Sequence, residues 1–496
     1  MPTPPSPSRA ALLLLPLALA ACSDPAPAPA DATVADAPDV APPDAAPDDV
    51  APDAAFPPCP FAPPRLGDST AARALAMNPE RCGQPAFRWL SSPDLGRPTG
   101  TGARQTYAAT ILRALATGAG ITLPVPITHD VVVEQLSYTT QDRGRLLDAT
   151  TLVAYPSNLA QRTSFEVLLV LHGTSGFNDA CAPSATSDAR LLGAAFAAAG
   201  YVVVAPDYVG LRAFGGPTGF PHPYLVGATT AVASLDAVRA GVRHLAALGG
   251  PACARQRFVT IGGSQGGHAA LWVDRIDGYY APELEAMGAV ATVPPADLEA
   301  QSNRGLRMTV QATANVAAFY TVIAPWYGLG GRLGEVFRAP WDVDLPMRLA
   351  TSCSPDVRGL TRESIFTQSF LDAAGGPQGI RGVPAWGCPV IENGLTSTTV
   401  PRSEHTAPGY GVLWVLGEQD QLVDTPIERA SFDTLCRQGY RMQYLECAGA
   451  SHTRATTWAI PEILEFARDR FAGRPLDAAA MCRVTPPTRC RATPAM

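Results

Sequence analysis

The chain has 496 residues, a formal net charge of −7, 47% hydrophobic residues and 16% charged residues. Eight Asp residues between positions 23 and 58, together with Arg9, account for the whole net charge, because the residues from Cys59 onward sum to zero. The acidity therefore says nothing about a substrate. No basic patch stands out, so we expect no nucleic acid partner.

Residues 1–22 have the layout of an export signal. Arg9 precedes an apolar run at residues 10–19, which is too short to span a bilayer and is typical of a secretory signal peptide. The run ends in Leu19-Ala20-Ala21-Cys22, which resembles a bacterial lipobox, so we expect Cys22 to be lipidated and to begin the mature protein. The alternative is a signal peptide that is cleaved nearby without lipidation. An acyl anchor would hold the exported protein on a bacterial membrane, facing the periplasm or the cell surface.

Residues 23–58 are almost entirely Ala, Pro, Asp and Val, so we expect a disordered, extended tether. The chain contains eleven cysteines, and ten remain once Cys22 is set apart. This even number and the export signal together predict an oxidising compartment and up to five disulfides. Connectivity does not follow from spacing, and proximity alone would pair Cys353 with Cys388 and Cys482 with Cys490. The sequence has no Cys-x-x-Cys pair and no Cys/His cluster, so we expect no metal site.

Residues 59–127 are punctuated by Pro and Gly and are interpreted as an N-terminal lead-in with one helix near residues 107–116. From residue 128 onward, strand and helix patterns alternate, which predicts a doubly wound, mostly parallel sheet of the α/β class. The expected strands are residues 131–138, 150–155, 165–171, 201–205, 258–261, 287–293, 412–416 and 442–445. The expected helices are residues 189–199, 225–248, 266–276, 427–437 and 458–471.

The alternation is interrupted once, at residues 296–409, which are rich in Pro, Gly and aromatic residues. A structureless loop of that length is improbable inside a compact domain, so we expect an inserted, largely helical cap with helices near residues 310–323 and 364–374. The cap would divide the core into residues 128–295 and 410–475, and a Cys-containing tail would follow at residues 476–496. We expect the cap to form the substrate pocket.

Gly262-Gly263-Ser264-Gln265-Gly266-Gly267 is the most informative motif in the chain. A β-branched and aromatic run precedes it and a helix-compatible run follows it. Gly262 and Gly266 fit the G-x-S-x-G nucleophile elbow, which holds a serine in strained geometry at a strand-to-helix turn. We therefore expect Ser264 to be a catalytic nucleophile, with a Gly-rich turn of no chemical role as the alternative.

A serine hydroxyl needs a histidine base that is itself oriented by an acid. In proteins with such a nucleophile elbow, the serine comes first along the chain, the Asp or Glu second and the His last. His452 follows the last expected strand and is our predicted base, in a loop of small residues, whereas His405 precedes the penultimate strand. Asp420 is the predicted acid. Asp424 competes with it but also fits a helix N-cap, and Glu418 lies closer to the strand.

The oxyanion of a tetrahedral intermediate needs two backbone N–H donors. The amide of Gln265, directly after the nucleophile, is one predicted donor. The other should come from the loop after the strand that ends at Leu171, where we choose Thr174, with Gly173 as the fallback.

Four segments carry a narrower signal: residues 205–211 (Ala-Pro-Asp-Tyr-Val-Gly-Leu), 222–227 (His-Pro-Tyr-Leu-Val-Gly), 234–240 and 263–268. With the elbow, they resemble the α/β-hydrolases and, more narrowly, the secretory lipase family related to fungal lipase A. The resemblance implies an α/β-hydrolase fold with a helical cap, activity on acyl esters, and no cofactor.

The leading hypothesis is serine-dependent hydrolysis of lipid or other acyl esters through an acyl-enzyme, by a membrane-tethered protein that we expect to be a monomer. One alternative is a prolyl-type serine peptidase, against which the lack of an obvious propeller domain counts. Another is a surface-binding module whose hydrolase fold has lost activity.

Overall fold

The computed structural model of this chain describes residues 58–66, 82, 89–118, 125–355, 357 and 359–494. The predicted signal peptide, the lipobox with Cys22, and the tether apart from residue 58 lie outside these residues. Of the helices in the described ranges, none has the length and apolar character needed to cross a membrane.

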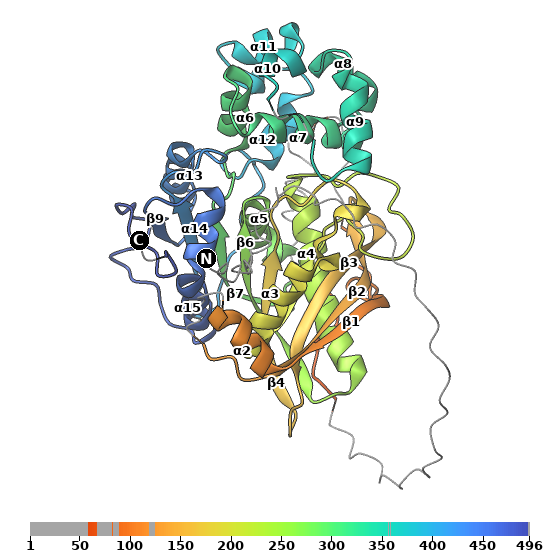
Figure 1. Cartoon of the computed structure of the whole chain (residues 1–496), viewed down its shortest axis with the longest axis vertical. Helices are drawn as coiled ribbons and strands as arrows, with labels where there is room; N and C mark the ends of the chain where they lie inside the picture. The colour runs from red at the N-terminus through yellow and green to blue at the C-terminus, as the bar shows by residue number, and fades with distance from the viewer. Residues whose placement is uncertain are drawn as a thin grey trace, which may run out of the picture.

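A nine-stranded sheet forms the centre of the molecule, in the order β1-β2-β3-β5-β4-β6-β7-β8-β9 (Figure 1). The pairs β1–β2, β2–β3 and β3–β5 are antiparallel, and every pair from β5–β4 to β8–β9 is parallel. This is the mostly parallel α/β sheet that the alternating pattern predicts. The strands are β1 (Pro98–Tyr107), β2 (Asp130–Asp142), β3 (Arg145–Ser157), β4 (Thr163–Leu171), β5 (Val202–Pro206), β6 (Ala252–Gly263), β7 (Glu285–Thr292), β8 (Val412–Gly417) and β9 (Met442–Cys447).

Apolar side chains on both faces of the central strands bind helices to the sheet. In β4, Leu169 and Leu171 pack in one cluster, with α4 (Gly227–Leu248) and α5 (Gln265–Tyr280), whereas Leu168 and Val170 pack in another, with α3 (Ser187–Ala198). Alternation with a period of two therefore explains why a continuous apolar run forms a strand buried on both faces. The remaining core helices are α2 (Ala109–Gly118), α13 (Thr425–Arg437), α14 (His452–Trp458) and α15 (Ile460–Phe471).

The segment between β7 and β8 folds as helices with a hydrophobic cluster of their own, which also takes in residues around Tyr224. In Figure 1 these helices stand at one end of the sheet, above α5 and α4. We call them the cap. They are α6 (Leu298–Arg307), α7 (Thr313–Trp326), α8 (Leu333–Val336), α9 (Trp341–Thr351), α10 (Arg362–Ile365), α11 (Gln368–Gly375) and α12 (Gly387–Asn393).

Two features of the fold correct the sequence-based expectations. The edge strand β1 falls in the expected lead-in, where mostly exposed residues and a Gly-containing stretch give no apolar alternation. His452 was expected in a loop, but it is the first residue of α14, because Ser451 is extended and serves as the N-cap.

Ten cysteines form five disulfides, and both pairings suggested by proximity are wrong. The reason is that the fold places each cysteine beside a partner on another element, so sequence distance is irrelevant. The disulfides are Cys59–Cys253, Cys82–Cys388, Cys181–Cys353, Cys436–Cys482 and Cys447–Cys490.

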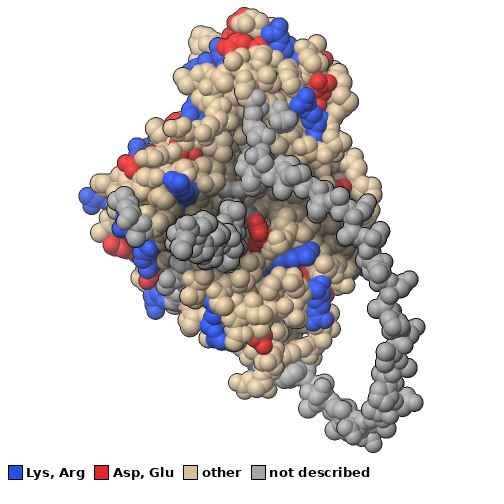
Figure 2. Space-filling model, in the orientation of Figure 1, with Lys and Arg blue, Asp and Glu red and all other residues tan. Residues whose placement is uncertain are grey.

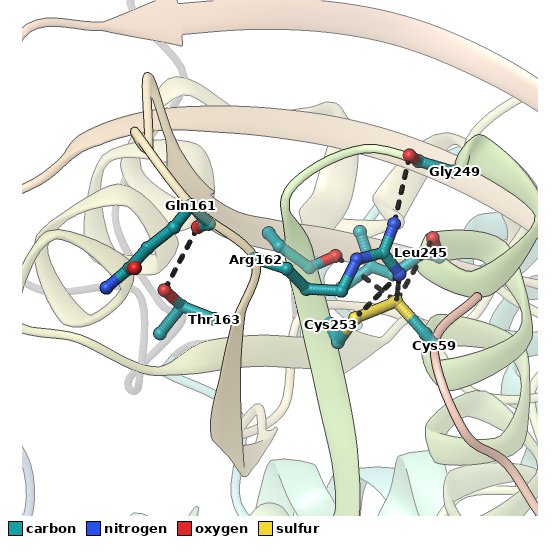
Figure 3. The surroundings of a disulfide bond; sticks show 8 residues. Cys59, Gln161, Arg162, Thr163, Leu245, Gly249 and Cys253 are labelled. Atoms are coloured by element: carbon teal, nitrogen blue, oxygen red, sulfur yellow. Dashed lines mark hydrogen bonds between the residues drawn. A yellow bond between two sulfur atoms is a disulfide. The ribbon is translucent and has the colours of Figure 1, made fainter. Parts of the chain in front are cut away.

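The first of these disulfides fastens residue 59 to the beginning of β6 (Figure 3). The Arg162 guanidinium lies beside it, with Nη1 3.1 Å from the sulfur of Cys59 and 3.3 Å from that of Cys253. Its Nη2 donates to the carbonyl of Gly249 at 3.1 Å. The N-terminal end of the described core is thereby fixed at the amino end of the central strand β6.

Charged side chains of both signs are scattered over the face shown in Figure 2, singly and in small groups. The two signs lie close to each other on the cap as well as on the core. This distribution agrees with the zero formal charge of the chain from Cys59 onward.

Candidate active site

Ser264 lies on the turn between β6 and α5, with φ 56° and ψ −119°. A positive φ is rare for a residue with a Cβ and costs of the order of 1–3 kcal/mol, so the surrounding structure must enforce it. Close packing does so: a Cβ on Gly262 would lie 1.9 Å from the carbonyl oxygen of Gly266, and one on Gly266 would lie 2.0 Å from that of Leu171. Only glycine fits at these two positions. The motif therefore forms a strained elbow that presents a partly exposed serine.

The carboxylate of Asp420 and the ring of His452 form a buried pair, with 2.7 Å between Oδ2 and Nδ1. Asp420 follows β8, and His452 follows β9. The other carboxylate oxygen, Oδ1, accepts the N–H groups of Leu422 and Val423 at 2.9 and 3.0 Å. These two bonds fix the carboxylate, so the hydrogen bond to Nδ1 leaves Nε2 as the nitrogen available to another group.

The two competing acids are occupied elsewhere. Asp424 caps α13, where its Oδ1 accepts the N–H of Ile427 at 3.3 Å and its Oδ2 pairs with Arg304. Glu418 accepts the N–H of Gly449 at 2.7 Å. Of the three candidates, the structure brings only Asp420 into contact with His452.

A chain of contacts joins the elbow to the helix that begins with His452. The N–H of Ser264 donates to the carbonyl of Thr292 at 2.9 Å, at the end of β7. The hydroxyl of Thr292 lies 2.6 Å from the hydroxyl of Thr456. Thr456 is four residues after His452 on α14, so both side chains lie on one face of that helix. Ser264 and His452 therefore lie at the same carboxyl edge of the sheet, on neighbouring segments.

The loop after β4 also reaches the elbow, because Leu171 is the register partner of Gly262 on β6. The predicted donor Thr174 is partly buried in this loop, and its hydroxyl lies 2.9 Å from that of Tyr224. Asn315, on cap helix α7, donates to the same Tyr224 oxygen at 3.2 Å. Thr174 is thus connected to the cap through one tyrosine.

Three other histidines, His172, His268 and His405, are held in contacts within the core. Burial lowers the pKa of His172 and of His268 to about 4, although each has a hydrogen bond to a backbone carbonyl. His405 stacks on Tyr410, and its Nε2 lies 3.1 Å from a carboxylate oxygen of Asp277. None of these three rings is hydrogen-bonded to Asp420 or to Ser264 in the described structure, and His268 contacts Ser264 only through its backbone N–H, which donates to the Ser264 carbonyl at 3.0 Å.

A solvent-open cleft of about 560 Å³ lies between the core and the cap, and Ser264 is part of its wall. The wall combines apolar side chains with a few uncharged polar ones, and none of these described residues is Asp, Glu, Lys, Arg or His. It consists of Tyr224, Leu225, Ser264, Pro295, Leu298, Gln301, Ser302, Ala312, Asn315, Val316, Phe319, Leu422 and Val423. The cleft therefore suits an uncharged, largely apolar ligand.

Among the described residues, one group of potential metal ligands lies close together, namely Cys82, Cys388 and Glu392. Its two sulfurs are bonded to each other, so they are not thiolates and the set does not fit a metal ion. Sequence reasoning missed Tyr224 and Asn315 as wall residues of the cleft. The only signal was the His-Pro-Tyr-Leu segment, which contains Tyr224 but assigns it no contact.

The geometry can be compared with known proteins. The family model described as secretory lipase matches residues 184–478, which is more than half of the chain. The chain belongs to the secretory lipase family. The matched residues include the elbow, the cap, and both Asp420 and His452.

Two relatives and one solved structure illustrate the similarity. A Mycobacterium tuberculosis (strain CDC 1551 / Oshkosh) protein named as a probable inactive lipase is 25% identical over 378 residues, covering 71% of this chain and 76% of that protein. A secreted triacylglycerol lipase of Malassezia furfur is 24% identical over 308 residues, covering 60% and 72%. The closed state of Candida antarctica lipase A superposes with a TM-score of 0.60 at 15% identity, covering 81% of this chain and 87% of that one. The expected α/β-hydrolase fold and the resemblance to lipase A are confirmed.

Proposed function

We propose that this protein hydrolyses carboxylic esters by a serine mechanism of the lipase and esterase type. His452 takes the proton of the Ser264 hydroxyl as its oxygen attacks the ester carbonyl, and Asp420 stabilises the imidazolium that forms. The N–H groups of Gln265 and Thr174 donate to the oxyanion of the tetrahedral intermediate. His452 then protonates the departing alcohol, which leaves an acyl group on Ser264. Water, deprotonated by His452, attacks this acyl-enzyme and releases the acid.

The observation that supports this proposal best is the combination of two geometries at one edge of the sheet. Ser264 has the strained backbone of an elbow, with φ 56°, and the buried Asp420–His452 pair has a 2.7 Å contact. A buried aspartate bound to one ring nitrogen of a histidine is the arrangement that lets the other ring nitrogen act as a general base toward a nucleophile.

The cleft favours an uncharged acyl group. Its wall beside Ser264 includes Leu298, Val316 and Phe319 from the cap, and it contains no charged side chain among the described lining residues. We infer glycerides or other lipid esters as substrates, in keeping with the relative named as a triacylglycerol lipase. We also propose that a lipid on Cys22 tethers the exported protein near such substrates, with residues 23–58 as the spacer.

One relative is named as inactive, which gives the inactive binding module an observation of its own. An active ester hydrolase and an inactive binding module differ in a property that can be measured, the reactivity of the serine. In a module without activity, the serine hydroxyl would have no unusual reactivity, and its removal would change no rate. A peptidase would instead cleave amide substrates, and one that recognises a free N-terminal amine would need an acidic group, which is not among the described residues of the cleft wall.

The decisive experiment measures hydrolysis of p-nitrophenyl esters of graded acyl length by the wild type and by Ser264→Ala. We expect the variant to lose at least about a thousandfold in kcat. A phosphonate probe that mimics an ester should add its mass to the peptide containing Ser264 in the wild type alone. Equal rates for the two proteins, together with no mass on that peptide, would refute the serine mechanism and favour the inactive module.

A further inference from the structure

Three aromatic rings are stacked beneath the elbow, and no step described so far uses them. The rings of His172 and Tyr208 are stacked with 4.0 Å between centroids, and Tyr208 and His222 follow at 5.8 Å with an interplanar angle of 19°. All three residues are buried. We call them the ring stack. It connects the loop after β4, the loop after β5 and the segment that leads into α4.

Tyr208 is held in an unfavourable backbone conformation, with φ 69°. For a bulky residue this costs of the order of 1–3 kcal/mol, and such strain is concentrated at functional sites. In this conformation the hydroxyl of Tyr208 lies 3.0 Å from the carbonyl oxygen of His172 and donates a hydrogen bond to it. Tyr208 thereby fixes the residue that comes two positions before the predicted donor Thr174.

His222 reaches the other predicted donor residue. Its Nδ1 lies 2.8 Å from the carbonyl oxygen of Val209, so the proton is assigned to Nδ1. Burial lowers the pKa of His222 to about 3, so the ring is neutral and Nε2 is an acceptor. The side-chain amide nitrogen of Gln265 lies 2.6 Å from this Nε2 and donates to it.

The Gln265 side chain depends on this bond. Its amide oxygen is buried and has no hydrogen-bond partner among the residues that the structure describes. A buried side-chain amide whose oxygen has no hydrogen-bond partner destabilises the fold. The presence of Gln265 at this position is therefore better explained by a functional role than by a purely structural one. His222 is itself fixed by Gly210, where a Cβ would lie 2.5 Å from the Cα of His222.

We propose that His222 and Tyr208 are positioning residues for the oxyanion hole. His222 holds the side chain of Gln265 and thereby the first turn of α5, whose leading N–H groups have no intrahelical acceptor. Tyr208 holds His172 and thereby the loop that carries Thr174. The ring stack fixes the distance between these two anchors. The inference rests on the proposed serine mechanism, because it assigns the two N–H groups as oxyanion donors.

The expected effect is specific to the transition state. Oxyanion donors must lie 2.7–3.1 Å from a charge that develops only during the reaction, and loss of one donor costs about 10²–10³ in kcat. A positioning residue shifts a donor without removing it, so we expect about a ten- to a hundredfold loss in kcat with KM changed by less than about twofold.

The experiment uses the full chain and two replacements of His222. In His222→Asn the side-chain amide can still donate to Val209 but does not reach Gln265, whereas His222→Gln places an acceptor near the position of Nε2. For each variant we would measure kcat and KM for p-nitrophenyl butyrate, the melting temperature, and inhibition by an alkyl trifluoromethyl ketone, which forms an oxyanion with the nucleophile. We expect His222→Asn to lose kcat and inhibitor affinity by the same factor and His222→Gln to recover both.

Matched variants separate positioning from general damage. His244→Asn removes another buried histidine contact, to Glu134 at 3.0 Å, away from the elbow, and should lower the melting temperature while kcat stays unchanged. In a Gln265→Ala background, His222→Asn should have no further effect on kcat, because its influence passes through Gln265. Tyr208→Phe should lower kcat and inhibitor affinity together.

The outcomes distinguish this inference from the mechanism on which it rests. If Ser264→Ala hydrolyses the ester as fast as the wild type, the serine mechanism fails. If Ser264→Ala is inactive but His222→Asn keeps the wild-type kcat, the positioning role is wrong. The positioning role would also be overturned if the kcat of His222→Asn fell only in proportion to the fraction of folded protein and His222→Gln did not restore it.

Discussion

Replacement of Glu428 by Gln should remove about 2.5 kcal/mol of pH dependence from the free energy of unfolding between pH 5 and pH 7. Glu428 lies on α13 and is fully buried. Its Oε1 accepts from the side-chain amide of Gln301 at 2.9 Å, and its Oε2 accepts the N–H of Ala296 at 3.1 Å. Burial outweighs these bonds and raises the pKa of Glu428 to about 8. The folded protein therefore holds a neutral carboxyl here, which a glutamine resembles in shape and charge.

The magnitude follows from proton linkage. Between the ordinary pKa of 4.5 and the folded pKa of about 8, the folded state keeps a proton that the unfolded state has lost. The free energy of unfolding therefore falls as pH rises, by up to about 1.4 kcal/mol per pH unit. Between pH 5 and pH 7 the wild type should lose about 2.5 kcal/mol that Glu428→Gln keeps. Other titrating groups contribute equally to both proteins, so the difference isolates Glu428.

The assay is urea unfolding of both proteins at several pH values from 5 to 8, with the disulfides intact. Tryptophan fluorescence and far-UV circular dichroism should give coincident transitions before a free energy is extracted. Plots of unfolding free energy against pH should diverge, because the wild type falls by about 2.5 kcal/mol more than the variant between pH 5 and pH 7. Parallel plots would show that Glu428 is ionised in the folded protein and would refute the reasoning.

Three further predictions concern the site and the buried charges. Asp420→Asn should lower kcat for p-nitrophenyl esters by about three to four orders of magnitude, because His452 loses its orienting acid, whereas Asp424→Asn should keep kcat. Gly266→Ala should abolish soluble folded protein, because its Cβ would lie 2.0 Å from a backbone oxygen, whereas Gly250→Ala has nothing within 4 Å and should melt within a few degrees of the wild type. Burial would lower the pKa of His405, but two neighbouring carboxylates outweigh it and raise that pKa. The stability that His405 contributes should therefore be complete below its ordinary pKa of 6.5 and disappear as pH rises through the folded value, so His405→Asn should flatten the unfolding free energy over that interval.

The central strands and the elbow were predictable because their signals are local. Leu168 to Leu171 form a continuous apolar run, which is what a strand buried on both faces requires. Ser264 stands between Gly262 and Gly266, where a Cβ atom would collide with the backbone of neighbouring segments. The chain order of Ser264, Asp420 and His452 agrees with the expected order of the constellation, and the structure brings the last two together.

Other features depend on contacts between distant segments and leave no local pattern. The bond between Gln265 and His222 joins residues 43 positions apart, and no periodicity announces it. The pairings expected from proximity are wrong for the same reason: Cys353, for example, bonds to Cys181, which is 172 positions away. The sequence favours Asp420 over Asp424 only through the fit of Asp424 to a helix N-cap, whereas the contact of Asp420 with His452 depends on the path of the loop.

Two disulfides determine how the cleft can open. Cys82–Cys388 and Cys181–Cys353 each join the cap to a segment outside it, in addition to the two chain connections after β7 and before β8. A lid that swung outward as one piece would drag the Cys181 segment with it, and this segment packs against Gly176 in the loop that carries Thr174. The two bridges therefore oppose a movement of the whole cap away from the cleft. Because such bridges persist where conditions are oxidising, a reducing environment would leave the cap held by its two chain connections and its packing alone.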